Sequence, residues 1–200
     1  MQSKYEGIKY VFLGNSGVGK TALCNRYVNK KFENIYQTTI GCSFHAKQYQ
    51  INDKMYGLEI WDTAGQERYR SILPMYYRHT DVAFICFDLT QDSYRILESI
   101  DHWVKELEKY NDNNKRLYYL VGTKKDLVEQ QTINSIFADI KKYYLDKTIF
   151  VTSSKNNEGV EEIFDISIRE LLLKKDLINN PSVINLSELP TKQKAGRKCC

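Results

Sequence analysis

Residues 14–21, with the sequence GNSGVGKT, constrain this chain more than any other segment, because they fit the phosphate-binding loop pattern G-x-x-x-x-G-K-[ST]. An apolar run precedes the segment at residues 8–13, and a helix-like run follows it at residues 22–28. Glycines allow the backbone to curl so that successive N–H groups point inward, and the following helix N-terminus adds partial positive charge. The segment therefore predicts a strand, a loop and a helix that together bind the phosphates of a nucleotide.

Two side chains of this loop have specific expected roles. Lys20 is expected to reach the outer phosphates, and the hydroxyl of Thr21 is expected to bind Mg²⁺. The other nucleotide contacts are expected from the rest of the loop and the start of the helix: Asn15, Ser16, Gly17, Val18, Gly19 and Ala22.

A second constellation, IWDTAGQE at residues 60–67, follows another predicted strand. Asp62 is a carboxylate at a strand end, which is where a side chain can hold the Mg²⁺ shell beside a triphosphate. Gly65 offers an unshielded N–H to a γ-phosphate oxygen. Gln66 can both donate and accept a hydrogen bond, so it can orient a water for in-line attack. Together with the first loop, these residues predict hydrolysis of a bound nucleoside triphosphate.

Predicted strands and helices alternate along the chain, which is typical of a mostly parallel sheet. The strands are predicted at residues 8–13, 42–51, 54–61, 81–88, 117–121 and 148–151, and the helices at 22–28, 93–110, 132–144 and 160–173. We expect one doubly wound α/β domain over residues 7–173, with helices on both faces of the sheet and phosphates at the carboxyl ends of its strands. Residues 1–6 are expected to form an N-terminal extension, and residues 174–200 a flexible tail.

The excess positive charge of the chain lies at its C-terminal end. The net charge is +4, and the last 27 residues carry six basic against two acidic side chains, so the remainder is neutral. A nucleic-acid surface would instead need a basic stripe on the folded domain, so no nucleic-acid partner is expected. A basic segment at one end suits an anionic lipid surface.

The cysteines and the N-terminus predict an intracellular protein that reaches a membrane through its tail. Cys24, Cys42 and Cys86 lie in apolar or strand-like runs without metal-ligand spacing, so we expect buried reduced thiols. The first residues lack the apolar core of a signal peptide, and Gln2 occupies the position where myristoylation needs glycine. No apolar run approaches the length of a membrane span.

At this point the chain resembles the small Ras-like GTPases and, within them, the Rab family, over about residues 7–173 and the last two residues. The run WDTAGQE at residues 61–67 is similar to that superfamily's second switch, and Thr39-Ile40-Gly41 resembles the first. The resemblance implies that the Thr39 side chain binds Mg²⁺ and its N–H the γ-phosphate. It also implies that Phe32 packs on guanine and that Tyr36 covers the phosphates.

Three further segments, at residues 40–44, 67–71 and 75–78, are similar to Rab-typical sequences, and residues 73–78 lean toward the early-endosomal Rab subgroup. The resemblance implies an effector surface, made of Ile40, Phe44, Trp61 and Tyr76. The alternative for the three aromatic side chains is packing in the core.

Thr123-Lys124-Lys125-Asp126 aligns with the family's guanine motif, which is usually Asn-Lys-x-Asp. Asp126 can accept hydrogen bonds from N1–H and the exocyclic amine of guanine, a pair that adenine does not present, and the Lys124 stem can lie over the ring. Thr123 removes an amide that in the family binds guanine N7 and braces the phosphate-binding loop, so somewhat weaker affinity is expected. Rho-type GTPases also carry threonine here, but the chain lacks their insert and their C-a-a-X ending. The backbone of Ser154 and Lys155 is expected to face the guanine carbonyl.

The terminal pair Cys199-Cys200 does not fit C-a-a-X prenylation but matches the double-cysteine ending of Rab proteins. The resemblance implies geranylgeranyl groups on both thiols, and two lipid chains hold a membrane stably where one is marginal. The alternative is a free pair of C-terminal thiols.

The resemblance implies a Rab-like switch that binds and slowly hydrolyses GTP with Mg²⁺ to regulate vesicle traffic. The implied partners are an exchange factor, a GTPase-activating protein, a prenyl-binding chaperone of the GDI or escort type, and effectors that read the switches. The protein is expected to be a monomer that cycles between the cytosol and the cytoplasmic face of endosomal or vesicular membranes. One alternative is a GTP-binding scaffold with little hydrolysis. Another is an ATP-dependent P-loop kinase, which Asp126 disfavours.

Overall fold

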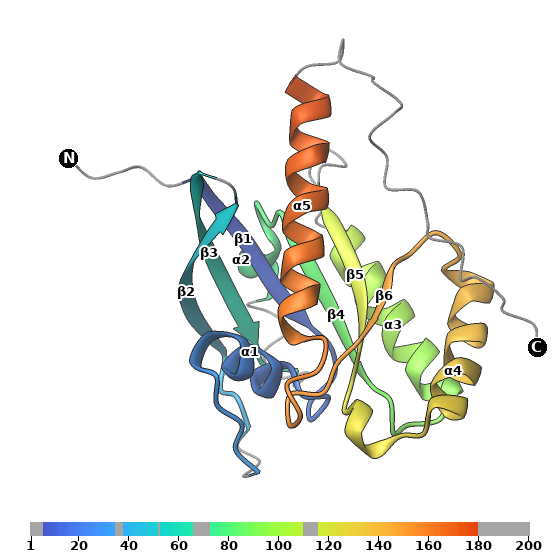
Figure 1. The fold of residues 1–200 in the computed structure, drawn as a ribbon. Coiled ribbons are helices and arrows are strands. Elements are labelled where there is room, and N and C mark those ends of the chain that lie inside the picture. The colour runs from blue at the N-terminus through green and yellow to red at the C-terminus, as the bar shows by residue number, and fades with distance from the viewer. Residues whose placement is uncertain (1–5, 35–37, 52, 66–72, 110–115, 180–200) are drawn as a thin grey trace, which may run out of the picture.

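A central mixed sheet organises the fold (Figure 1). The computed structural model describes residues 6–34, 38–51, 53–65, 73–109 and 116–179. The six-stranded sheet has the order β2-β3-β1-β4-β5-β6. The strands are β1 (Glu6–Leu13), β2 (Cys42–Ile51), β3 (Lys54–Thr63), β4 (Val82–Asp88), β5 (Leu117–Thr123) and β6 (Ile149–Val151).

Helices cover both faces of this sheet (Figure 1). They are α1 (Lys20–Asn29), α2 (Leu73–Tyr77), α3 (Ser93–Glu108), α4 (Gln130–Tyr143) and α5 (Val160–Asn179), with a 3₁₀ turn η2 (Lys125–Leu127). One buried cluster joins the sheet to α1 and α5, and the other joins it to α2, α3 and α4. Pairing is parallel throughout except between β2 and β3, which form an antiparallel hairpin. The predicted doubly wound, mostly parallel fold is therefore confirmed.

The core is built around β4, every residue of which is buried, as its continuous apolar run predicts. On one face, Phe84 of β4 packs edge-on against Phe164 of α5, with ring centroids 5.3 Å apart. Phe164 in turn stacks on Tyr27 of α1 at 3.5 Å. This packing fixes α1 against the sheet, so the loop between β1 and α1 is held at the carboxyl edge of the strands.

The loops that carry the predicted functional residues all leave this same edge. β1, β3, β4 and β5 are parallel neighbours in register, so the segments that follow them lie side by side next to the start of α1 (Figure 1). This is the edge at which open α/β sheets bind ligands.

The structure differs from the sequence prediction at the boundaries of the domain. α5 continues to Asn179, six residues beyond the predicted end at 173, and Glu6 belongs to β1 rather than to an N-terminal extension. Lys175, in the added part of α5, contacts Glu6 at 3.0 Å and Asp81 at 3.4 Å. These ion pairs join the end of α5 to the sheet.

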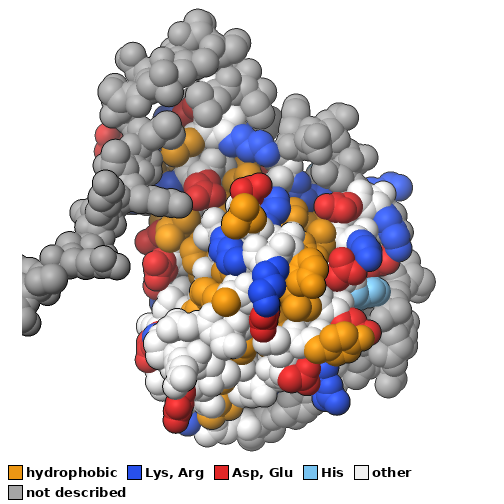
Figure 2. All heavy atoms as spheres, turned by 90° about the vertical axis from the view of Figure 1, so that its right-hand side faces the viewer, with side chains coloured by type: hydrophobic (Ala, Val, Ile, Leu, Met, Phe, Trp, Pro, Cys, Tyr) orange, Lys and Arg blue, Asp and Glu red, His pale blue; other side chains and the backbone are white. Residues whose placement is uncertain are grey.

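Cys24 and Cys86 are buried free thiols as predicted, whereas Cys42 is only half-buried. On the face that Figure 2 turns toward the viewer, which includes α4, basic and acidic side chains are interspersed with apolar ones. Within the part of the chain that the structure describes, no helix is both long and apolar enough to cross a membrane.

Candidate functional site

The loop between β1 and α1 is wrapped around the ammonium group of Lys20. The Lys20 Nζ donates to the carbonyl oxygens of Gly14 at 2.7 Å and Asn15 at 2.9 Å, and the residue is only 5% exposed. Burial lowers the pKa of this ammonium group. Gly14 has φ +140°, and a Cβ there would lie 2.3 Å from the Cys86 carbonyl oxygen, so only glycine fits this start of the loop.

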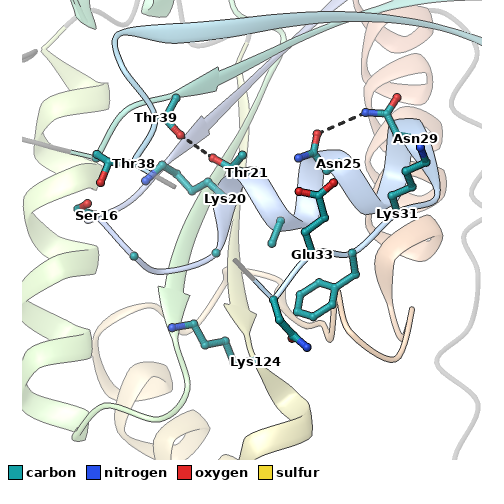
Figure 3. A pocket seen from close by; sticks show the side chains of 16 residues that line it. Ser16, Lys20, Thr21, Asn25, Asn29, Lys31, Glu33, Thr38, Thr39 and Lys124 are labelled. Carbon is teal, nitrogen blue, oxygen red and sulfur yellow. Dashed lines mark hydrogen bonds between the residues drawn. The ribbon is translucent and has the colours of Figure 1, made fainter. Parts of the chain in front are cut away.

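A cavity of about 680 Å³ adjoins this loop. Figure 3 shows the side chains that line it. The cavity is lined by many of the predicted nucleotide residues, namely Ser16, Gly17, Gly19, Lys20, Thr21, Ala22, Phe32, Thr39, Gly65 and Lys124. It is also lined by residues that the sequence did not single out: Asn25, Asn29, Lys31, Glu33, Asn34 and Thr38. The cavity is therefore enclosed by residues 31–34 and 38–39 together with the segments that follow β1, β3 and β5.

Two of the three residues predicted to hold Mg²⁺, Thr21 and Thr39, line this cavity, and the third, Asp62, is buried beside Thr21 without lining it. The hydroxyls of Thr21 and Thr39 are hydrogen-bonded at 2.7 Å (Figure 3). Asp62 is fully buried, and neither of its carboxylate oxygens has a hydrogen-bond partner among the described residues. Burial raises the pKa of Asp62, and the nearby Thr21 hydroxyl and Lys20 ammonium only partly offset this.

An unpaired buried carboxylate is costly, and a bound cation removes that cost. Two hydroxyl oxygens and one carboxylate form the hard oxygen donor set that Mg²⁺ prefers in nucleotide sites. The donors of Thr21, Thr39 and Asp62 therefore fit this ion.

The segment after β3 lies directly against the phosphate-binding loop. A Cβ added to Gly65 would lie 2.4 Å from both the carbonyl carbon of Asn15 and the nitrogen of Ser16. The Asn15 side chain accepts a hydrogen bond of 2.9 Å from the indole N–H of Trp103, a buried residue of α3. The loop is thus fixed from two sides, and Trp103 is a contact that the sequence analysis missed.

Thr123 ends β5 and is 2% exposed. Its hydroxyl lies 2.5 Å from the carbonyl oxygen of Val18 and 2.9 Å from that of Phe87, and can donate to one of them at a time. Neither Val18 nor Thr123 lines the cavity. We expected Thr123 to leave the phosphate-binding loop without a supporting contact from this position. This expectation was wrong, because the Thr123 hydroxyl contacts the loop at Val18.

The predicted base-binding residues lie next to β5 and β6. Asp126, in η2, accepts a 2.7 Å hydrogen bond from the Ser153 hydroxyl. Arg26 of α1 donates to the carbonyl oxygens of Ser154 at 2.6 Å and Lys155 at 3.2 Å. Arg26 and Ser153 therefore orient the two segments expected to read the base, although no motif pointed to Arg26.

The predicted effector surface lies on β2, β3 and α2, with Ile40 in the segment just before β2. The rings of Phe44 and Trp61 are 5.0 Å apart, and those of Trp61 and Tyr76 are 5.4 Å apart. Phe44 is 51% exposed and Ile40 is 80% exposed. The three aromatic side chains pack on one another and still leave apolar surface open to solvent.

Four of the predicted site residues lie outside the described residues: Tyr36, Gln66, Cys199 and Cys200. Their assigned roles remain predictions from the sequence.

Comparison with known proteins agrees with this geometry. Residues 9–173 match the Ras family. The chain is 40% identical over 175 residues to "Ras-like GTP-binding protein RYL2" of Yarrowia lipolytica, an alignment that covers 84% of this chain and 82% of the relative. It is 34% identical over 199 residues to "Ras-related protein Rab-7a" of Dictyostelium discoideum, covering 96% of each chain. It is 38% identical over 178 residues to human "Ras-related protein Rab-30", covering 87% of this chain and 86% of the relative. The chain therefore belongs to the Ras family and is a Rab-like small GTPase.

Proposed function

We propose that this Rab-like GTPase switches by ordering the segments around Thr39 and Gly65 on GTP and releasing them on hydrolysis. The observation that carries the proposal is that Lys20 and the Thr21–Thr39 hydroxyl pair line one cavity, with the unpartnered Asp62 carboxylate buried beside them. Ras-family GTPases bind GTP and GDP, generally with Mg²⁺.

The proposed reaction is slow hydrolysis of the γ-phosphate bond. Thr21, Thr39 and Asp62 would hold Mg²⁺, which would supply neutralisation of the phosphate charge. Lys20 exchanges its two backbone carbonyl partners for phosphate oxygens, and Gln66 orients the attacking water. No arginine finger was identified in the sequence, so unaided turnover is expected on the order of 10⁻⁴ s⁻¹.

The base site is proposed to select guanine. Asp126 accepts from N1–H and the exocyclic amine, and the backbone of Ser154 and Lys155 donates to the guanine carbonyl. The Lys124 stem and the Phe32 ring cover the two faces of the purine. Support comes from Phe32 and Lys124 both lining the cavity.

Rab and Ras-family GTPases generally interact with exchange factors, activating proteins, GDI-type chaperones and effectors, and Rab proteins work on intracellular membranes. For this chain we propose that effectors read the exposed surface of Ile40, Phe44, Trp61 and Tyr76. We also propose attachment to endosomal or vesicular membranes through geranylgeranyl groups on Cys199 and Cys200, with GDI-type extraction to the cytosol.

Gln66→Leu tests the proposed reaction. The variant is expected to bind GTP with unchanged affinity and to hydrolyse it about tenfold more slowly, since a single water-orienting hydrogen bond is lost. Single-turnover assays with Mg²⁺ measure this rate. Gln131→Leu, the same change at an exposed position of α4, is the control and should hydrolyse like the parent.

Two results would contradict the proposal. Unchanged turnover in Gln66→Leu would remove the assigned role of Gln66. Tight GTP binding by the parent without any turnover, even with activating proteins, would favour the GTP-binding scaffold instead.

A further inference from the structure

Asp88, the last residue of β4, holds the ammonium group of Lys124. The Asp88 Oδ2 atom accepts from the Lys124 Nζ at 2.6 Å. The other oxygen, Oδ1, accepts from the Thr90 backbone N–H at 2.9 Å and from the Thr90 hydroxyl at 2.8 Å. The Asp88 side chain is only 8% exposed, so both oxygens are fixed by partners in a mostly buried position.

Lys124 is held at both of its ends. Its backbone is left-handed, with φ 60° and ψ 37°, at the start of η2. A non-glycine residue keeps this conformation only where its surroundings enforce it. With the backbone fixed by the turn and the ammonium fixed by Asp88, the four-carbon stem between them has little freedom left.

This stem forms part of the wall of the nucleotide cavity (Figure 3). The side chain is 34% exposed, whereas an unpaired lysine on a loop would extend into water. Ordering a lysine side chain is entropically costly, so a stem that is ordered in advance lowers the cost of binding a flat ring against it.

The same end of β4 also supports the residue before Lys124. Asp88 is in register with Thr123, and the Leu89 N–H donates to the Thr123 carbonyl oxygen at 3.2 Å. The Thr123 hydroxyl lies 2.9 Å from the Phe87 carbonyl oxygen. Residues 87–89 therefore hold both Thr123, the last residue of β5, and Lys124, which lines the cavity.

We propose that Asp88 is a positioning residue for the nucleobase: it anchors Lys124 so that the lysine stem is already aligned against the purine ring before the nucleotide binds. This inference rests on the proposed guanine-nucleotide function of the cavity and assigns a role to a residue outside the phosphate-binding loop, the switches and the base motif. Asp88 itself does not line the cavity and acts only through Lys124.

Asp88→Asn tests this role, because asparagine keeps the shape of the side chain but removes its charge. GDP affinity is expected to fall by about tenfold, the effect of one hydrogen bond to a charged group. Inorganic tripolyphosphate, which has no base, should bind the parent and the variant equally in competition against a fluorescent nucleotide. Equal weakening of both ligands would show a general structural defect and overturn the proposal.

A double-mutant cycle that combines Asp88→Asn with Lys124→Met separates the ion pair with Lys124 from other roles of Asp88. Methionine keeps an apolar stem but has no ammonium, so GDP affinity should again fall about tenfold, and Asp88→Asn should add nothing further in that background. Lys124→Arg should bind GDP more tightly than Lys124→Met because it retains the ion pair with Asp88. This pair of Lys124 variants keeps the test decisive if Asp88→Asn does not fold.

Lys125→Met is the matched control, since Lys125 pairs with Glu158 at 2.6 Å and does not line the cavity. It should bind GDP like the parent. If the parent prefers GDP over ADP but Asp88→Asn binds GDP as tightly as the parent does, the role of Asp88 is contradicted while the proposed guanine-nucleotide function stands. If the parent shows no preference for GDP, the proposed function fails as well.

Discussion

Lys20→Met is expected to weaken GTP and GDP binding by about 10²–10³-fold, the range for removing one partner of a buried charge–phosphate contact. Lys20 is 5% exposed and begins α1, directly after the phosphate-binding loop. The other two described lysines that line the cavity, Lys31 and Lys124, lie outside this loop. Methionine fills the same volume but cannot donate to phosphate oxygens.

The same change should not destabilise the nucleotide-free protein. There the Lys20 ammonium has two carbonyl partners, and burial lowers its pKa below the ordinary 10.5, so the folded state binds this proton less tightly than the unfolded state. At neutral pH the positive charge of Lys20 therefore lowers the free energy of unfolding. This cost decreases as the pH rises from the lowered pKa of the folded protein to the ordinary 10.5. Thermal unfolding without nucleotide should give Lys20→Met a melting temperature equal to or above that of the parent.

Lys141→Met provides the control for this opposite response. The Lys141 Nζ also donates to two carbonyl oxygens, those of Leu145 at 2.9 Å and Lys147 at 2.7 Å, but lies on α4 away from the cavity. It should lose some stability and no nucleotide affinity. If Lys20→Met lost stability without nucleotide in proportion to its loss of binding, the lysine would be a folding residue rather than a phosphate ligand.

Gly65→Ala is expected to slow GTP hydrolysis by about 10–100-fold while GDP affinity changes only a few-fold, since one charge-assisted N–H contact to the γ-phosphate is lost. The added Cβ would lie 2.4 Å from backbone atoms of Asn15 and Ser16. These atoms cannot move away freely, because Asn15 is held by Trp103 and its carbonyl oxygen by Lys20. Gly65 must therefore retreat from the phosphate-binding loop.

Single-turnover hydrolysis and GDP titration measure the two effects separately. Gly7→Ala is the control, because a Cβ there meets only the end of the Glu59 side chain, at 3.3 Å, which can rotate away. It should behave like the parent in both assays. Gly65→Ala with parental hydrolysis would mean that this glycine does not sense the γ-phosphate.

Local sequence patterns predict two kinds of segment well: strands that are buried along their whole length, and loops that carry a specific binding motif. The apolar run of β4 and the glycine-rich loop after β1 were both located correctly from the sequence. α2 was missed because five residues that include a proline carry no helical periodicity. The end of α5 was placed too early because its last turns are supported by Lys175 contacts to Glu6 and Asp81, which are distant in sequence.

The residues of the candidate site also fall into two groups, those that belong to a sequence motif and those that do not. Residues with their own motif, such as Lys20 and Asp126, were named from the sequence alone. Trp103, Asp88 and Arg26 were not, because their partners lie 36 to 128 positions away and no local spacing reports such contacts. Thr123 was expected to weaken the site, and only the folded structure places its hydroxyl against Val18 and Phe87.

Guanine-nucleotide binding and GTP hydrolysis are tested together by the nucleotide content and turnover of the purified protein with Mg²⁺, comparing GTP with ATP. We expect co-purified guanine nucleotide and slow hydrolysis of GTP, on the order of 10⁻⁴ s⁻¹, with no comparable binding or turnover of ATP. A protein that bound GTP and ATP equally, or neither of them, would contradict the assignment of the cavity and of Asp126.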